Sequence, residues 1–229
     1  MRRRPVVCAI VIGILFVGAR AQAQGEPPEA GFGDKGRFAL GADRLFGYVH
    51  ASESQTNAGN TTTTTFNSIS VLGSPIHNIA SVFSFPRVGF DAFVGQSVSL
   101  GGSLTYFHLS QSGNGSSDTV SGFLIAPRLG FAARLGPSVW LWPRAGITYA
   151  SFSTGVGAGL SQDSSLLAAT VEAPVAVALG PQAFLLIGPT VDLGLSGSTK
   201  TNGDIGIGTP SSDIKETDIG LQVSFLFYL

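Results

Sequence analysis

Cysteine, charge and long apolar runs are all scarce in this chain of 229 residues. Its one cysteine, Cys8, lies near the start, so no disulfide within the chain can stabilise the fold. Charged residues make up 12% of the chain, about half of the quarter found in an ordinary soluble domain. No later segment matches the ~20 apolar residues of a membrane-spanning helix. These absences exclude a disulfide scaffold and a helical membrane protein, and they leave little charge for a soluble surface.

The first 23 residues have the pattern of a secretory signal peptide. Arginines at 2–4 precede the apolar stretch Val6–Ala19, and Ala21-Gln22-Ala23 matches the small-x-small cleavage pattern. We therefore expect the mature chain to begin at Gln24. Cleavage removes four of the 13 basic residues and leaves nine against 14 acidic residues, a formal charge of about −5. This charge argues against nucleic acid as a partner, because nucleic acid is bound by basic surfaces.

After a lead-in rich in Gly, Pro and Glu at residues 24–36, the hydrophobicity of the chain alternates with a period of two. Such alternation places apolar side chains on one face of a β-strand and polar side chains on the other. Eight segments show it, at residues 37–49, 85–94, 98–108, 123–135, 139–149, 167–179, 185–195 and 217–229. The sequence thus predicts one all-β domain over residues 37–229.

The connections between these segments fall into two classes that alternate strictly. Three are short turns, at residues 95–97, 136–138 and 180–184. Four are long and polar, at residues 50–84, 109–122, 150–166 and 196–216. This alternation is typical of a transmembrane β-barrel with short periplasmic turns and long extracellular loops. It predicts an eight-stranded antiparallel up-and-down barrel with both termini on the periplasmic side.

The first long connection leaves the strand number open. Residues 61–66 form the run Thr-Thr-Thr-Thr-Thr-Phe, and Ile69, Val71 and Ile76 follow. Thr and Phe favour strands, so this stretch could form a hairpin that protrudes above the membrane. It could also supply two further wall strands, which would give a barrel of ten strands.

The last segment shows the two-faced pattern most plainly. In residues 218–229 the odd positions are Ile, Leu, Val, Phe, Phe and Leu, and the even positions are Asp, Gly, Gln, Ser, Leu and Tyr. One face of this strand is therefore wholly apolar and the other is mostly polar or small. In an outer-membrane barrel the apolar face contacts lipid and the polar face lines the interior.

When the more apolar face of every segment is turned to lipid, the charged residues collect inside. The inward positions carry Arg37, Asp43, Arg87, Asp91, Arg128, Arg134, Arg144, Glu172, Asp192 and Asp218. Only Arg44 falls on the outward phase, where a basic side chain at mid-membrane costs roughly 2–4 kcal/mol. A bulge in the first strand is the preferred explanation, because Leu45 is also out of phase.

These five arginines and five carboxyls allow complete pairing inside an interior that side chains just fill. A guanidinium can bind a carboxylate through two parallel hydrogen bonds. We therefore expect a hydrogen-bonded ion-pair network that fixes the shape of a plugged barrel. The alternative is an ion-conducting constriction formed by the same charges.

Several segments resemble the small outer-membrane β-barrel domain family, the group of OmpA- and OmpX-type barrels. They are residues 86–91 (Pro-Arg-Val-Gly-Phe-Asp), 99–104 (Ser-Leu-Gly-Gly-Ser-Leu) and 126–130 (Ala-Pro-Arg-Leu-Gly). The last strand is similar to the assembly signal of that family, through Gly220, Val223, Phe225, Phe227 and Leu229, although Leu229 replaces the usual final Phe.

The resemblance implies a monomer in the outer membrane of a Gram-negative bacterium. Its expected partners are outer-membrane lipid, lipopolysaccharide and, during insertion, the barrel-assembly machinery. It implies a fold and a location more strongly than a function.

The histidines raise the possibility of an enzyme that modifies lipid A. His108-Leu109-Ser110 resembles the arrangement in lipid A deacylase barrels, and His50-Ala51-Ser52 repeats the spacing beside Glu53. A serine nucleophile needs a base and an orienting acid, and the nearest acid to the first pair, Asp118, lies in a predicted loop. We expect no catalytic residue, metal site or cofactor. The expected function is structural or surface-interacting, with a narrow channel for small solutes and lipid A modification as alternatives.

Overall fold

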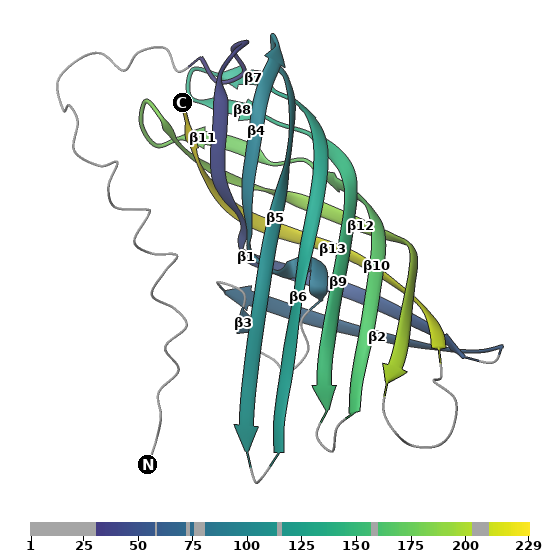
Figure 1. Ribbon diagram of the computed structural model, residues 1–229. Helices are drawn as coiled ribbons and strands as arrows, with labels where there is room; N and C mark the ends of the chain where they lie inside the picture. Colours follow the sequence, from purple (N-terminus) through teal and green to yellow (C-terminus); the bar gives the residue numbers. More distant parts are fainter. Residues whose placement is uncertain are drawn as a thin grey trace, which may run out of the picture.

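The computed structural model describes residues 31–57, 59–71, 74–75, 81–113, 116–156, 160–202 and 211–229. It consists of one antiparallel sheet of thirteen strands that closes on itself (Figure 1). The predicted signal peptide, residues 1–23, lies outside the described residues. No helix in the described part of the chain is long and apolar enough to cross a membrane.

Eight strands form the wall of the closed barrel. Three of them are interrupted and carry two labels each. In order around the barrel they are β1 (Phe38–Asn57), β4 (Arg87–Gly95), β5 (Val98–Gly113), β6 with β7 (Ser116–Phe131, Ala133–Gly136), β8 with β9 (Val139–Leu141, Arg144–Val156), β10 with β11 (Leu160–Glu172, Val175–Ala178), β12 (Ala183–Asn202) and β13 (Ser211–Tyr228). The first and last strands pair from Ala39 with Tyr228 to Thr56 with Asp213, which closes the wall. The prediction of eight strands is confirmed.

Prolines cause two of the interruptions. Pro143 separates β8 from β9, and Pro174 separates β10 from β11. Proline has no N–H to donate to a ladder, but its carbonyl can still accept. The N–H of Phe131 donates to Pro143, and the N–H of Trp142 donates to Pro174, both at 2.9 Å. The wall therefore stays hydrogen-bonded across both interruptions.

The two ends of the barrel differ in their connections. At one end, called the turn end, the chain makes the three predicted short turns, and β1 begins and β13 ends there (Figure 1, top). At the opposite end, called the hairpin end, the strands continue far beyond the predicted segment ends. The predicted long loops are largely strand, because β5 and β6 pair as far as Gly113 and Ser116, and β9 and β10 as far as Val156 and Leu160. Ser- and Gly-rich sequence lacks the alternation that revealed the other strands, so this part of the prediction was wrong.

The first connection forms a hairpin and adds no strand to the closed wall. β2 (Asn60–Val71) pairs with the C-terminal half of β1, at the hairpin end, and β3 (Ser74–Pro75) pairs with the last two residues of β2. The N-terminal part of β1, at the turn end, pairs instead with β4. Of the two expectations for residues 50–84, the structure has the protruding hairpin.

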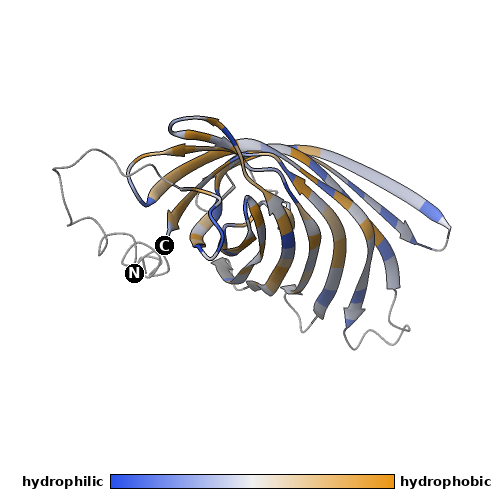
Figure 2. Cartoon of the chain, turned by 90° about the horizontal axis from the view of Figure 1, so that it is seen from above, coloured by the Kyte–Doolittle hydropathy of each residue, from blue (hydrophilic) through white to orange (hydrophobic). Residues whose placement is uncertain are grey.

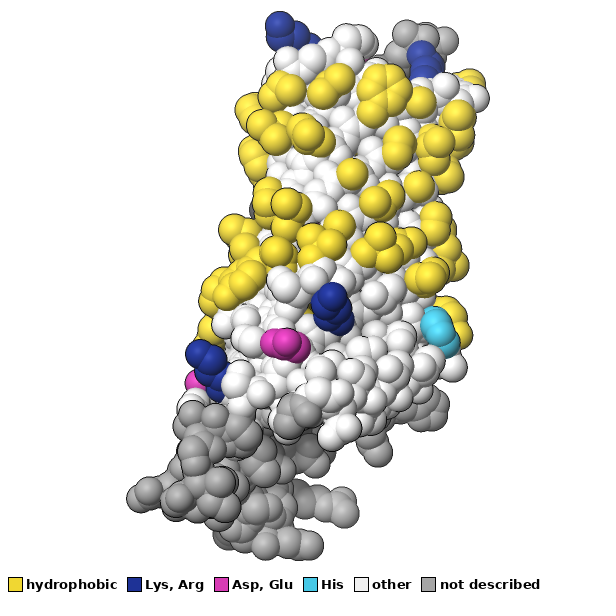
Figure 3. All heavy atoms as spheres, turned by 90° about the vertical axis from the view of Figure 1, so that its right-hand side faces the viewer, with side chains coloured by type: hydrophobic (Ala, Val, Ile, Leu, Met, Phe, Trp, Pro, Cys, Tyr) yellow, Lys and Arg dark blue, Asp and Glu magenta, His cyan; other side chains and the backbone are white. Residues whose placement is uncertain are grey.

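The barrel is apolar outside and polar at mid-height inside. Its outer surface carries many half-exposed large hydrophobic side chains, among them Leu40, Val88, Leu100, Ile125, Leu129, Val171, Ile187 and Leu221. Figure 3 shows hydrophobic side chains spread over the upper and middle part of one face, with charged side chains above and below them. Seen from above, the barrel strands carry many orange, hydrophobic stretches among paler ones, whereas the hairpin that projects to the right is mostly pale (Figure 2). An apolar outer surface and a polar interior are the reverse of the distribution in a soluble protein, and they suit a barrel surrounded by lipid.

Candidate functional site

The interior is the candidate site, because its charged groups have no place in an ordinary apolar core. Arg44 enters it through a bulge in β1. The pairing of β1 with β13 shifts register between Ala42 and Phe46, and Arg44 has a φ of 58°, which is uncommon for a residue other than glycine. The bulge predicted from the sequence is present, and it turns Arg44 inward, so its outward assignment by phase was wrong.

Inside the barrel, the Arg44 side chain of β1 contacts residues of two other strands, β10 and β12. Its guanidinium forms ion pairs with Asp192 on β12 at 2.7 Å and with Glu172 on β10 at 3.1 Å. It also donates a hydrogen bond to the Thr190 hydroxyl at 3.1 Å. The Arg44 side chain is only 5% exposed, so the bulge produces a buried charge that is paired with two carboxylates.

Arg128 on β6 forms the second centre. Its Nε and Nη2 atoms donate to the two carboxylate oxygens of Asp91 on β4, at 3.1 and 2.5 Å. Its Nη1 atom donates to Asp43 on β1 at 2.6 Å. The fork geometry of the guanidinium fits this bidentate arrangement. One side chain thereby connects three strands of the wall.

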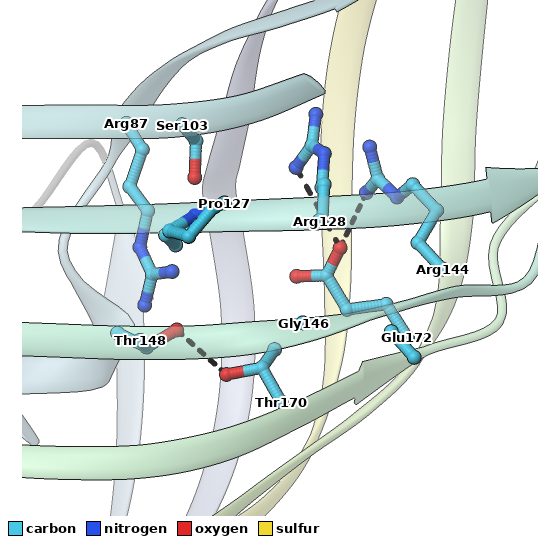
Figure 4. A pocket seen from close by; sticks show the side chains of 11 residues that line it. Arg87, Ser103, Pro127, Arg128, Arg144, Gly146, Thr148, Thr170 and Glu172 are labelled. Carbon is cyan, nitrogen blue, oxygen red and sulfur yellow. Dashed lines mark hydrogen bonds and ion pairs between the residues drawn. The ribbon is translucent and has the colours of Figure 1, made fainter. Parts of the chain in front are cut away.

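Arg144 on β9 completes the network. Its Nη2 atom lies 2.7 Å from Glu172, but outside hydrogen-bond geometry, so the contact is an ion pair. Its guanidinium also lies 4.6 Å from the centre of the Trp142 ring, within cation–π range. Figure 4 shows Arg128 and Arg144 directed at the Glu172 carboxylate from one side of the interior. Glu172 is therefore the shared ion-pair partner of Arg44, Arg128 and Arg144. These four residues, together with Asp43, Asp91 and Asp192, are called the charged belt.

A short 3₁₀ turn, η1 (Val82–Ser84), covers this belt on the side of the hairpin end. The Phe83 carbonyl accepts hydrogen bonds from both Arg44 and Arg87. Ser81, which caps the turn, donates to the Asp218 carboxylate. Among the described residues, no carboxylate lies within ion-pair distance of Arg87. The backbone of η1 thus supplies the acceptor that the side chains do not.

Two apolar layers enclose the charged belt. Towards the hairpin end, Val82 and Phe83 pack with Phe107, Leu124, Leu166 and Ile214. At the turn end the layer consists of Phe32, Phe93, Trp140, Trp142, Phe184, Leu186, Leu226 and Tyr228, with small residues between them. The cavities lined by residues of the charged belt have volumes of about 10 Å³ each, which is about the space of one water molecule. Side chains therefore fill the described interior.

In the segment 31–36, which the sequence analysis assigned to the lead-in, Phe32 belongs to this turn-end layer. Phe32 is buried among five aromatic rings, at 4.8–5.7 Å between ring centres. The Tyr228 hydroxyl accepts from the N–H groups of Gly33 and Asp34 and donates to the Gly31 carbonyl. The segment closes the turn end of the barrel.

The structure brings together most of the predicted interior charges, but two lie elsewhere. Asp43, Arg87, Asp91, Arg128, Arg144, Glu172, Asp192 and Asp218 are all buried. Arg37 and Arg134 are exposed at the turn end, where a long side chain leaves the narrow interior for solvent. Arg134 donates to the Gly136 carbonyl and lies over Trp140.

The sequence analysis missed Glu216, which is buried beside Asp218. Extending the even phase of β13 by one more step would have found it, because positions 216 and 218 share a face.

The odd-numbered residues of the predicted assembly signal lie on the outer face, as the alternation along the strand predicts. Val223, Phe225 and Phe227 are partly exposed on the outer face, and Leu229 is exposed at the strand end.

The histidine candidates do not assemble into a catalytic arrangement in the described residues. The Nδ1 atom of His50 lies 2.8 Å from the side-chain oxygen of Asn67, which also accepts from the Tyr48 hydroxyl. His108 is exposed, and the side chain of Ser110 and all of His77 lie outside the described residues. No group of three or more His, Cys, Asp or Glu side chains suited to a metal ion occurs in the described chain.

Comparison with known proteins gives a match in structure alone. No family model matches the chain, and no curated protein matches its sequence. The crystal structure of the outer membrane protein OprG from Pseudomonas aeruginosa is 13% identical and superposes with a TM-score of 0.54, over 85% of this chain and 96% of OprG.

Two further structures are similar to a lesser degree. AlkL, an outer membrane protein studied in DMPC lipid bilayers, is 14% identical with a TM-score of 0.48, over 91% of this chain and 98% of AlkL. The outer membrane protease OmpT from Escherichia coli is 7% identical with a TM-score of 0.47, over 84% and 97%. The closed eight-stranded wall, its apolar outer surface and the likeness to OprG identify the fold as that of a small outer-membrane β-barrel protein.

Proposed function

We propose that the chain is a non-conducting, non-enzymatic barrel that anchors surface hairpins in the outer membrane of a Gram-negative bacterium. The filled interior is the observation that carries this proposal. Two apolar layers and a belt of ion pairs lie between the two ends, and the belt cavities hold about 10 Å³ each. Hydrated ions need a continuous water-filled path, and two packed apolar layers oppose such a path.

The proposed orientation places the turn end in the periplasm and the hairpin end outside the cell. Short turns at one end and long connections at the other support it. Both the segment from Phe32 and the end of β13 lie at the turn end, which fits periplasmic termini. The hairpins β1–β2, β5–β6, β9–β10 and β12–β13 would then form the surface seen by other molecules. Loops and hairpins of such scaffolds commonly carry their function.

Conductance across a planar bilayer tests the proposal. Purified, refolded protein should give no steady ohmic current, whereas a general-diffusion porin reconstituted in the same way should give one. Folding is checked by the different gel mobilities of unboiled and boiled protein. Steady channels from folded protein would contradict the filled interior and favour the narrow-channel alternative.

Labelling on intact cells tests the orientation. Because Cys8 is the only cysteine, single cysteines introduced by Thr62→Cys on β2 and Gln182→Cys in the last short turn report on one end each. A membrane-impermeant maleimide should label the first variant on intact cells and the second only after the outer membrane is opened. The reverse result would overturn the orientation.

Mass spectrometry of lipid A tests the absence of enzymatic activity. Expression of a barrel without such activity should leave the lipid A masses unchanged.

A further inference from the structure

Glu216 and Asp218 are buried carboxyls at the hairpin end, and together they are called the carboxyl pair. They stand two residues apart on the interior face of β13, and their exposed fractions are 5% and 1%. Among the described residues, neither has a basic side chain within ion-pair distance, and Oε1 of Glu216 and Oδ1 of Asp218 are buried without a hydrogen-bond partner. If both were ionised, the barrel would hold two unpaired buried charges, which is costly.

The neighbouring strands carry further carboxyls opposite this pair. Glu216 is paired across the ladder with Glu53 on β1, and Asp218 is paired with Asp192 on β12. Like charges directly opposite each other in a ladder repel, so both partners disfavour a negative charge on the carboxyl pair. Burial, with a contribution from the Asp218 carboxylate, also raises the pKa of Glu216 well above 4.5. Glu216 therefore keeps its proton at a pH at which an exposed glutamate has lost it.

The cations that act on the carboxyl pair are Arg44 on β1 and Arg87 on β4. Both guanidinium groups donate hydrogen bonds to the carbonyl of Phe83. Arg44 is also ion-paired with Asp192 and Glu172. The two positive charges are thus engaged at the charged belt and at η1, and they leave the carboxyl pair without a direct partner.

Ser81 connects the carboxyl pair to η1. Its hydroxyl donates to Asp218 and accepts from the N–H of Phe83 at 3.0 Å. A hydrogen bond also joins Ser81 to Glu216. Because the single hydroxyl proton is donated to Asp218, Ser81 can only accept from Glu216, and a carboxyl donates only when it is protonated. One proton on Glu216 therefore satisfies the whole group, whereas its loss places two carboxylates on one hydroxyl.

Three attachments hold η1 inside the barrel, and only one of them depends on this proton. The first is the contact of Ser81 with the carboxyl pair. The second is the Phe83 carbonyl, which the two arginines bind. The third is Phe85, directly after η1, whose ring stacks on Phe107 at 4.5 Å between ring centres. Loss of the proton therefore weakens the start of η1 and leaves its end in place.

We propose that a single proton, shared by Glu216, Ser81 and Asp218, fastens the start of η1 to β13, and that loss of this proton frees the Ser81 end of η1. The device is closed at acidic pH and loosens as the pH rises. Its release exposes Val82, which otherwise packs in the apolar layer of the hairpin end. The proposal rests on the proposed function in one respect, because a hairpin end outside the cell makes the external pH the one that is sensed.

The experiment measures how fast a cysteine in η1 reacts with a maleimide. The full chain carries Cys8→Ser and Val82→Cys and is studied folded in nanodiscs. Since a thiol reacts faster at higher pH in any protein, each rate is divided by that of the exposed Thr62→Cys at the same pH. The ratio should rise about tenfold between pH 5 and pH 8, the effect of a shift of one pKa unit on an opening equilibrium.

Variants of the proton site separate the proposed device from other titrations. Glu216→Gln should keep the ratio low at both pH values, because an amide N–H can donate to Ser81 without titrating. Ser81→Ala should raise the ratio at both, and Ser81→Thr, which keeps the hydroxyl, should restore the rise with pH. Replacing His50, His77 and His108 by glutamine should leave that rise unchanged.

A matched control distinguishes a local release from general unfolding. Leu124→Cys, on β6 in the same apolar layer and 1% exposed, should stay unreactive at both pH values. The proposal would be overturned by a constant Val82→Cys ratio, by a rise that persists in Glu216→Gln, by a rise that the histidine replacements abolish, or by equal reactivity of Leu124→Cys.

Failure of the proposed function would appear in other measurements. The turn-end layer around Phe32 does not depend on the carboxyl pair, so no steady current is expected at pH 5 or pH 8. A steady current, or labelling of Thr62→Cys only in opened cells, would contradict the proposed function and would leave the ratio for Val82→Cys unchanged.

Discussion

Arg128 and Asp91 are joined by side-chain hydrogen bonds from both Nε and Nη2 of the guanidinium, across a strand that lies between them. Asp91 on β4 is paired with Gly101 on β5, and Gly101 is paired with Arg128 on β6. A Cβ atom on Gly101 would collide with the Phe90 carbonyl and would lie 2.5 Å from the Asp91 carboxylate. The missing side chain at Gly101 therefore allows the guanidinium of Arg128 to reach Asp91.

The first prediction follows from that arrangement. Gly101→Ala should destabilise the barrel by roughly 1–3 kcal/mol, the usual cost of forcing an extra group into a packed interior. Gly136→Ala is the matched control, because a Cβ atom there would meet nothing within 4 Å. Urea unfolding in detergent, followed by tryptophan fluorescence, measures both. Equal stability of the two variants would show that Gly101 has no such role.

The second prediction concerns the charge of Arg128 itself. Arg128→Met should cost about 3–5 kcal/mol, because it leaves the buried Asp91 carboxylate without its partner and Asp43 with only the more distant Arg144 at 3.6 Å. Arg134→Met, which changes an exposed arginine at the turn end, should fall within about 0.5 kcal/mol of wild type. The same urea titrations compare the two. A mild effect of Arg128→Met would mean that water or other side chains compensate these carboxylates.

The sequence predicts the wall of this barrel well and its hairpin end poorly. Alternation of apolar and polar residues is imposed wherever one face meets lipid, so it reveals segments such as 98–108 and 185–195. Beyond the lipid both faces meet water, and the Thr run at 61–65 has no period to detect. Its strand forms because antiparallel pairing with β1 continues past the membrane.

The interior was predicted in kind but not in full detail. The phase of each strand places Asp91, Arg128 and Glu172 inside, since a charge facing lipid is costly. It fails at Arg44, because a bulge reverses the phase within one strand. It also cannot find Phe83, whose backbone carbonyl binds two arginines, because a main-chain group leaves no signature in the identity of the residue.

The third prediction is a dependence of stability on pH through Glu216. This residue lies beyond Ile219, the last exposed apolar residue on the outer face of β13. Burial, with a contribution from the nearby Asp218 carboxylate, raises the pKa of the Glu216 carboxyl well above its ordinary value of 4.5. The folded state therefore keeps this proton to a higher pH than the unfolded state does. Stability is greatest below the unfolded pKa and falls as the pH rises towards the folded one.

Replacing the carboxyl should remove that dependence. Glu216→Gln should lose less stability than wild type between pH 5 and pH 8, in urea titrations at each pH. Asp213→Asn, which changes an exposed carboxyl on the outer face of the same strand, should keep the wild-type dependence. If Glu216→Gln and wild type respond alike to pH, the protonation of Glu216 is not linked to folding.

The fourth prediction concerns the turn-end layer, which should contribute to the stability of the barrel but should not be needed to block ion flow. Phe32→Ala should cost about 3–5 kcal/mol, because the ring is buried among other aromatic rings and its loss leaves a cavity. Phe38→Ala removes a ring that is 46% exposed on the outer surface and should cost much less. Neither variant should conduct ions in a planar bilayer, since the charged belt around Glu172 and the apolar layer around Phe83 remain. A steady current through folded Phe32→Ala, with none through Phe38→Ala, would instead make the segment that carries Phe32 the seal of the barrel.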